Sequence, residues 1–275
     1  MTIYDDISGL ENNLTERSKG IFLKERTFFK EMMNDILDPI YRGASPTFTV
    51  SDDSRDPSLV LMARLVNDYE ASLRLILMGL GEQAFQTMRD SVETSLLLLL
   101  FQFDGDLATR WMIDLKKYRV GNTILELKKH GVDYPFGEMY STLSALSHPN
   151  MLASLHVVEE VQVGEDQFLR RYHFGGYGNF GFMRQQLKLL LTLMITAIIG
   201  ALPIPLGAND PEFTEWWEKV QKLPQRLKDE VGLDVEYSRE PIDKSVQQKI
   251  NFQMKVDLFS PEALAEASKL DETNL

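Results

Sequence analysis

The sequence predicts an all-α fold, a multi-helix bundle with a small β-hairpin inserted before the penultimate long helix. Apolar residues recur at helical spacing through most of the 275 residues, which is the primary sign of amphipathic helices. Helix start and stop signals, such as Asp56 followed by Pro57 and the glycines Gly79 and Gly81, divide the chain into segments. The spacing changes to strand-like alternation only between residues 155 and 174.

The first half of the chain is expected to be helical from end to end. Residues 5–41 form a long amphipathic helix or a helix pair, and a polar loop follows to Asp56. The next helix runs from residue 57 to residue 79 or 81, and the one after it ends at residues 103–105. A further helix is expected from about residue 106 to residue 130. Its apolar side is formed by Trp111, Leu115, Tyr118 and Leu125.

The second half is expected to begin with a shorter helix that stops at His148, because Pro149 disfavours helical geometry in the residue before it. A β-hairpin near 155–174 and a glycine-aromatic loop over 175–181 come next. A helix carrying residues 189–206, another near 212–231 and a short terminal helix from Ser260 complete the chain. Three regions follow from this order: residues 1–56 with the N-terminal long helix and loop, residues 57–206 with the bundle core, and residues 207–275 with a helix and an irregular tail.

Composition limits the classes of function. The net charge of −12 argues against broad adhesion to nucleic acid or to anionic membranes, although it allows a local basic groove. The chain has no cysteine, which excludes disulfide frameworks and thiolate metal sites and fits a cytoplasmic location. Residues 189–206 carry no charge and approach the length of a membrane span, but the pattern favours a central helix packed on all sides. We therefore expect no membrane association.

Arg89 and Glu93 are the most informative residues, because they lie on the same helical face as Phe85, Val92 and Leu96. A charge buried without a partner costs several kcal/mol, so both side chains need partners if the helix is largely buried. An Arg–Glu pair four residues apart satisfies part of that need. On this basis, replacing Arg89 by alanine is expected to destabilise the fold by a few kcal/mol.

The helix that ends at His148 can supply the remaining partners. Tyr140, Ser144, Ser147 and His148 form a polar row beside its apolar stripe. We expect this row to complete a buried Arg–Glu–Tyr–Ser–His network. The candidate catalytic residues are Arg89, Glu93 and His148, and the candidate binding residues are Tyr140, Ser144, Ser147 and Asn150.

Three interpretations of this network stay open: a structural lock between helices, a site in which His148 acts as acid and base or binds a ligand with Arg89, and an oligomer interface. No metal site is expected, because the histidines lack a carboxylate at ligand spacing within a helix. No cofactor is expected either, since phosphate-loop, dinucleotide and nucleophile-elbow motifs are absent.

The pattern resembles a bacterial family filed as a domain of unknown function, which is similar to the HEPN-like helical bundles. The matching residues lie within positions 57–202 and are Arg89, Glu93, Tyr140, Leu143, Ser144, His148, Pro149 and Asn150. The resemblance implies nucleotide binding or metal-independent RNase activity. RNases of this class carry an arginine shortly before the histidine, and here the corresponding positions hold Ser141, Thr142 and Leu143.

The sequence favours a non-enzymatic binding or assembly module, acting as a homodimer or with a protein partner. The alternative is a HEPN-like nucleotide-binding protein or RNase that uses Arg89 and His148, with RNA or a nucleotide as its partner.

Overall fold

The computed structural model describes residues 3–39, 55–103, 105–113, 119–130, 136–147, 158–162, 168–172, 179–200, 211–233, 235–239 and 250–254. This part of the chain is an all-α bundle with two pairs of short strands appended to it. The predicted all-α class and multi-helix bundle are therefore confirmed.

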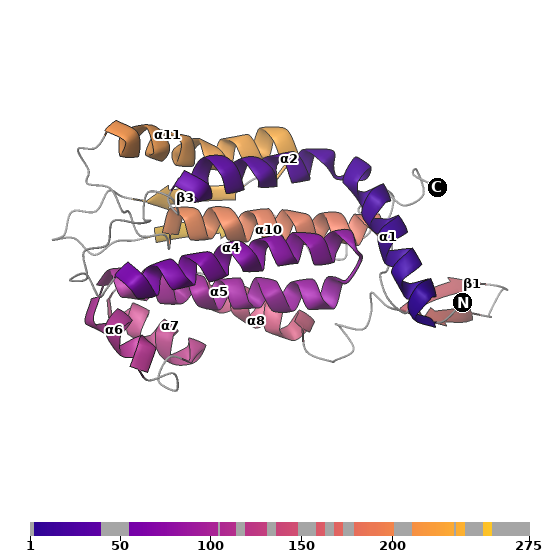
Figure 1. The fold of residues 1–275 in the computed structure, drawn as a ribbon, viewed down its shortest axis with the longest axis horizontal. Coiled ribbons are helices and arrows are strands. Elements are labelled where there is room, and N and C mark those ends of the chain that lie inside the picture. Colours follow the sequence, from indigo (N-terminus) through magenta and orange to yellow (C-terminus); the bar gives the residue numbers. More distant parts are fainter. Residues whose placement is uncertain are drawn as a thin grey trace.

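The helices are layered, with α10 at the centre. They are α1 (Ile3–Ile21), α2 (Leu23–Glu31), the π-helical η1 (Met32–Leu37), α4 (Arg55–Leu77), α5 (Gly81–Phe103), α6 (Gly105–Ile113), α7 (Val120–Lys129), α8 (Phe136–Ser147), α10 (Phe180–Gly200), α11 (Pro211–Arg226) and the π-helical η3 (Leu227–Val231). α10 lies between α2 and α11 on one side and α4 and α5 on the other (Figure 1). α8 covers the outer side of α5, and α6 and α7 lie at one end of the bundle.

The turn between α4 and α5 shows how local sequence sets this arrangement. Gly79 has a positive φ of 75°, a backbone conformation that glycine adopts without steric cost. The amide of Gly79 donates to the carbonyl of Ile76 and the amide of Leu80 to that of Leu75, so the last carbonyls of α4 are satisfied. α5 begins at the next residue and runs back along α4.

The prediction of a single helix from about residue 106 to residue 130 is wrong, because the residues that the structure describes in this range form two helices, α6 and α7. Arg119, with φ −71° and ψ 143°, is extended and starts α7. The break changes which residues face the core. Leu125, expected on the apolar side, is 60% exposed, whereas Thr123 and Leu127 are buried. Two short helices let Trp111 contact Phe101 at the end of α5 and let Leu127 also reach the core.

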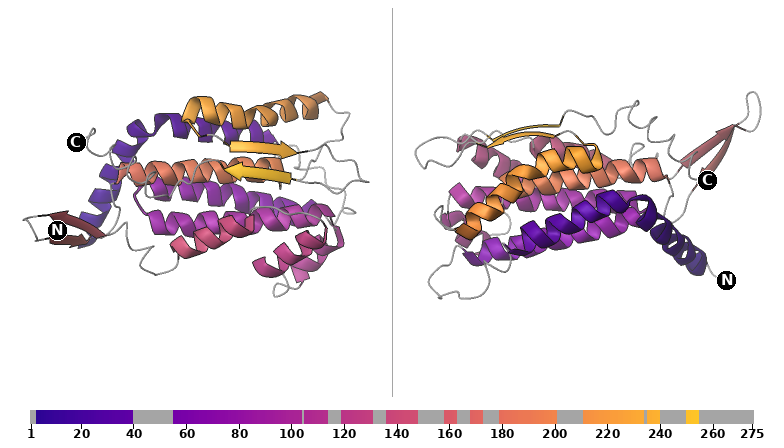
Figure 2. Two further views of the ribbon diagram at one scale, coloured as in Figure 1. Left: turned by 180° about the vertical axis from the view of Figure 1, so that it is seen from behind. Right: turned by 90° about the horizontal axis from the view of Figure 1, so that it is seen from above.

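Two strands occupy the segment in which a β-hairpin is expected. β1 (Val158–Gln162) and β2 (Phe168–Tyr172) pair antiparallel, with Val158 opposite Tyr172. They project from the end of the bundle at which α1 also projects, on the opposite side (Figure 2).

A second antiparallel pair, β3 (Val235–Arg239) and β4 (Ile250–Met254), lies beside α10 and α11 and is absent from the sequence prediction. Both segments alternate apolar and polar residues, which is the signal that could have revealed them. The glycine-aromatic residues 175–178 and the terminal helix expected from Ser260 lie outside the described residues.

α10 is the core helix of the bundle. By length and composition α10 could cross a membrane, but 78% of its apolar window is buried inside the protein. Burial on all sides is what a central helix of a globular core requires. The phenol of Tyr69 on α4 donates to the carbonyl of Leu193 on α10, at 3.4 Å, so even this buried hydroxyl is paired.

One buried cluster spans all three predicted regions of the chain. It includes Phe28 from the N-terminal region, Leu96 and Ile195 from the central region, and Leu223 from the C-terminal region. The N-terminal helices and α11 therefore share the core of the central helices.

Candidate functional site

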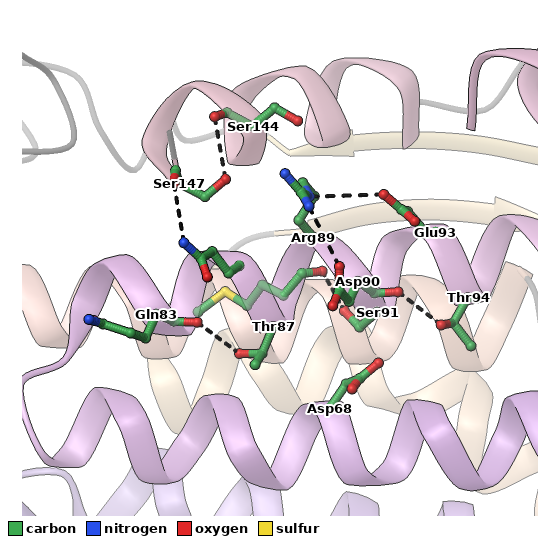
Figure 3. A network of polar contacts seen from close by, with 12 residues as sticks. Asp68, Gln83, Thr87, Arg89, Asp90, Ser91, Glu93, Thr94, Ser144 and Ser147 are labelled. Carbon is green, nitrogen blue, oxygen red and sulfur yellow. Dashed lines mark hydrogen bonds and ion pairs between the residues drawn. The ribbon is translucent and has the colours of Figure 1, made fainter. Parts of the chain in front are cut away.

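Arg89 and Glu93 project from α5 toward α8, the helix expected to supply their partners (Figure 3). Nε of Arg89 lies 3.9 Å from Oε1 of Glu93. This distance makes an ion pair but exceeds a hydrogen bond. The two side chains are 26% and 31% exposed. The prediction of a buried network is therefore wrong in degree: α8 covers the pair only partly, although Phe85, Val92 and Leu96 on the same face are fully buried.

Tyr140 of α8 completes the contact with α5. The guanidinium carbon of Arg89 lies 5.9 Å from the centre of the Tyr140 ring, within the range of a cation–π interaction. Glu93 and Ser144 are the polar side chains that act on the Tyr140 hydroxyl. Burial raises the pKa of Tyr140 above its ordinary value, and the negative charge of Glu93 raises it further. The phenol is therefore a hydrogen-bond donor at neutral pH.

Ser144 and Ser147 place the end of α8 over α5. The hydroxyl of Ser147 donates to the carbonyl of Ser144 at 3.3 Å, and the carbonyl of Ser147 accepts from Nε2 of Gln86 at 3.4 Å. Gln86 is three residues before Arg89, which is one turn along the same face. Of the predicted site residues, the structure thus brings Arg89, Glu93, Ser144 and Ser147 together between two helices (Figure 3). Tyr140 joins them through its contact with Arg89. His148 and Asn150 lie outside the described residues.

Three further charges extend the cluster onto α4, and the sequence analysis missed them. Nη2 of Arg89 lies 3.8 Å from Asp90, and Asp90 lies 3.8 Å from Nη2 of Arg64. Arg64 in turn lies 3.7 Å from Asp68. The carboxylate of Asp90 joins Arg89 to Arg64 on α4. Because Asp90 directly follows Arg89, its carboxylate can contact Arg89 on α5 and Arg64 on α4.

We call the residues Arg64, Asp68, Arg89, Asp90 and Glu93 the charge chain. Positive and negative side chains alternate along it, and its ion-pair distances all fall between 3.7 and 3.9 Å. At these lengths each charge is stabilised by its neighbours without being locked in a hydrogen bond to them. Nε of Arg89 and Oδ2 of Asp68 are shielded from solvent and have no hydrogen-bond partner.

Asp68 is the most perturbed acid of the charge chain. Its side chain is 18% exposed. Burial raises the pKa of Asp68 to about 6; Arg64 opposes this rise and Asp90 adds to it. The carboxyl of Asp68 therefore changes charge near neutral pH, where an ordinary aspartate is fully ionised.

Among the residues that the structure describes, no group of three His, Asp or Glu side chains is placed to hold a metal ion. The cluster itself offers an arginine with open donors, a phenol donor and carboxylate acceptors.

The cluster has to be interpreted from its own geometry. No protein-family model matches the chain, and no curated protein and no solved structure matches it at a significant level.

Proposed function

We propose that this chain is a non-enzymatic assembly module that forms a homodimer through the face shared by α5 and α8. The observation that carries the proposal is the partial exposure of Arg89 and Glu93, at 26% and 31%, in a stripe that is otherwise fully buried. A structural lock would be enclosed, whereas an interface centre needs charged groups that are oriented in advance and still accessible.

The residue types support a protein partner. Arginine and tyrosine are enriched among the residues that dominate binding energy at protein interfaces. Here Arg89 lies over the ring of Tyr140, and the Tyr140 hydroxyl interacts with Glu93 and Ser144. Side chains positioned in this way lose little conformational freedom on binding.

The arrangement of charges favours a second copy of this chain as the partner. Arg89 and Glu93 lie side by side on one face. A two-fold axis through that face would set Arg89 of each copy against Glu93 of the other, because an isologous interface pairs the same patch with itself. The proposal includes a cytoplasmic location, and the buried position of α10 supports a soluble protein.

Charge exchange tests the proposal. Light scattering after size-exclusion chromatography should give twice the chain mass of 31.5 kDa for the wild type. Arg89→Glu and Glu93→Arg should each be monomeric, because each sets like charges against one another across the axis. Mixing the two variants should restore a dimer, since one chain then carries two negative charges and the other two positive charges at these positions.

The control is a pair of the same spacing away from this face. Arg74 and Glu70 on α4 form an ion pair of 2.9 Å and are well exposed. Arg74→Glu and Glu70→Arg should leave the mass unchanged. A wild type that stays monomeric at concentrations of about 100 μM would contradict the proposal, because stable interfaces reach Kd values far below that level.

A second candidate function is the HEPN-like nucleotide-binding or RNase activity that uses Arg89 and His148. It is favoured by the contact between Gln86 and the Ser147 carbonyl, since Ser147 directly precedes His148 and Gln86 is one turn from Arg89. Cleavage of a single-stranded RNA by the wild type, lost in both Arg89→Ala and His148→Ala while their melting temperatures are retained, would establish this activity. Wild-type protein that leaves the RNA intact would exclude cleavage.

A further inference from the structure

The junction of α1 and α2 carries an excess of positive charge in an acidic protein. One cation lies near the end of α1 and three lie on α2; the residues Arg17, Lys24, Arg26 and Lys30 form what we call the basic junction. The acids of the same stretch already have basic partners, Glu16 with Lys19, Glu25 with Arg184 and Glu31 with Arg226. Among the described residues, no carboxylate forms an ion pair with a cation of the basic junction. The junction is therefore positive on a chain with a net charge of −12.

The two arginines of the basic junction are positioned without being neutralised. The guanidinium carbon of Arg17 lies 5.0 Å from the centre of the Phe180 ring. Nη1 of Arg26 donates to the carbonyl of Lys19 at 2.7 Å. A ring and a carbonyl orient a guanidinium but leave its positive charge uncancelled. Groups that are oriented in advance lose less conformational freedom when an anion binds them.

Leu23 adds an apolar group to the basic junction. Its side chain is 62% exposed. At 100° per residue it lies on α2 between Lys24 on one flank and Arg26 and Lys30 on the other. The exposed side of α2 thus presents a leucine bordered by cations.

Stabilisation of a helix end does not account for this pattern. Basic residues favour the C-terminal end of a helix, but α2 continues directly into η1, which runs to Leu37. An exposed helix face usually carries charges of both signs. The unpaired cations therefore indicate a surface for a partner that is anionic and partly apolar.

The chain itself contains a segment of this chemistry. Residues 256–275, which lie outside the described residues, hold five acidic residues and one lysine. Their apolar residues include Leu258, Leu264 and Leu270. A segment with a net negative charge and several leucines complements a surface with four cations and one exposed leucine.

The last described strand ends on the side of the bundle that carries α2. α2 packs against η3, and η1 packs against α11, so the two helical pairs run antiparallel (Figure 1). The chain that leaves η3 therefore heads toward the start of α2. Met254 pairs with Val235, which follows η3 by a few residues. Residues 256–275 can extend about 65 Å, whereas α2 is about 14 Å long.

We propose that residues 256–275 bind to the basic junction of the same chain, with their carboxylates on its cations and a leucine over Leu23. A molecule that binds the basic junction has to displace this segment first. The contact goes beyond the proposed dimer interface, because α2 and α8 lie on opposite sides of α10 (Figure 1).

A distance measurement tests the proposal in the full-length chain. The sequence has no cysteine, so Thr27→Cys and Ala267→Cys together provide two unique positions for nitroxide labels. The doubly labelled protein is diluted with unlabelled protein, and pulsed electron paramagnetic resonance then reports distances within one chain. We expect one narrow distance distribution. Lys24→Glu combined with Lys30→Glu should lower the ratio of bound to free segment about tenfold or more, because repulsion replaces attraction at two positions.

The matched control is Lys128→Glu combined with Lys129→Glu, which makes the same change of net charge on exposed lysines of α7, at the other end of the bundle. It should keep the narrow distribution. Glu262→Lys combined with Glu266→Lys should lose it, and joining this pair to Lys24→Glu and Lys30→Glu should restore it. A broad distribution in the wild-type background, or a narrow one that neither reversal changes, would overturn the proposal.

Discussion

Glu25 and Arg184 lie on different helices and meet in the interior, whereas Arg89 and Glu93 are neighbours on one helix and lie at the edge of the bundle. Nε of Arg184 is 2.8 Å from Oε1 of Glu25, and the Glu25 side chain is only 7% exposed. Nη2 of Arg184 also donates to the carbonyl of Ile21 at 3.2 Å, and its guanidinium lies over the ring of Phe22. This pair ties α10 to the junction of α1 and α2.

The pair of Arg89 and Glu93 differs in its distance and in the exposure of its acid, although both arginine side chains are 26% exposed and both lie over an aromatic ring. Its ion-pair distance is 3.9 Å, both residues are partly exposed, and its additional contacts are an aromatic ring and a neighbouring carboxylate. The comparison shows that a leucine-rich helix around an Arg–Glu pair does not by itself make that pair a structural lock between helices. Burial and distance across helices decide the role, and by these measures Glu25 and Arg184 form the lock.

Removing the arginine of the tight pair should have the largest effect. Arg184→Ala leaves the Glu25 carboxylate buried without its partner, and we expect a loss of about 3 kcal/mol in the free energy of unfolding. Urea unfolding of the two proteins measures it. Arg74→Ala, which opens an exposed pair of nearly the same length, should change stability by less than about 0.5 kcal/mol.

A double variant sharpens this test. Glu25→Leu combined with Arg184→Met replaces both charges by apolar groups, and it should recover at least half of the loss caused by Arg184→Ala. If the single variant Arg184→Ala is as stable as the wild type, the Glu25 carboxylate is not buried in solution.

The second test concerns another contact of α10. Nε2 of Gln186, a fully buried residue, donates to the carbonyl of Gly81 at 3.1 Å, and a Cβ at position 81 would lie 2.6 Å from that nitrogen. Gly81→Ala should therefore destabilise the protein by about 2 kcal/mol, because the amide has to move and break its hydrogen bond.

Gly121 provides the control, since it lies at the start of α7 and a Cβ there would meet nothing within 4 Å. Thermal unfolding should show Gly121→Ala to be neutral or slightly stabilised. Equal melting temperatures for the two alanine variants would mean that α5 and α10 are farther apart at Gly81 than the structure shows.

The third test measures how stability depends on pH, because Asp68 of the charge chain should titrate well above the range of an ordinary aspartate. The pKa of Asp68 rises from 3.8 to about 6 on folding, so the folded state binds a proton that the unfolded state has released. The wild type should therefore lose stability as pH rises from about 4 to about 6, and the loss should persist at pH 7. Relative to the wild type, Asp68→Asn should gain between about 1 and 2 kcal/mol over this interval.

Chemical denaturation at pH 4, 5, 6 and 7 gives the free energy of unfolding of both proteins. The difference between the two proteins removes the contribution of the other carboxylates, which both share. A constant difference across this range would show that Asp68 titrates as an exposed aspartate does.

The smallest effect is expected at the residue that the sequence singles out. Arg89→Ala should destabilise the monomer by about 1 kcal/mol or less, because water can replace its contacts with partly exposed carboxylates. This expected destabilisation is smaller than the few kcal/mol predicted from the sequence, because that prediction assumed a fully buried Arg89. A double-mutant cycle with Glu93→Ala, measured at a concentration low enough to avoid association, should give a coupling energy of about 0.5 kcal/mol.

The sequence predicts the helices α4, α5, α8, α10 and α11 because each combines apolar periodicity with a clear start or stop signal. It fails at Arg119, where nothing as strong as proline or a glycine pair marks the break between α6 and α7. It also fails at β3 and β4, whose alternation covers only five residues in each strand. Short elements of this kind depend on the neighbours that they pack against.

The candidate site shows the same limit. Helical spacing places Arg89, Glu93 and Tyr140 on facing sides of α5 and α8, but it does not say how far α8 covers them. Glu25 and Arg184 escape notice altogether, because Glu25 stands in a polar, amphipathic segment and Arg184 stands near the start of α10, and a charge at either place ordinarily faces water. Their contact and the burial of Glu25 result from the packing of α2 against α10, which no local pattern encodes.

The central position of α10 has a consequence for synthesis. The ribosome releases α4 and α5 well before α10, and at ordinary translation rates the interval is on the order of ten seconds. During that time the leucine-rich side that α10 later covers has no helix to pack against. A chain that terminates before residue 180 would keep this surface exposed permanently, so premature termination should yield an aggregating product rather than a smaller folded one.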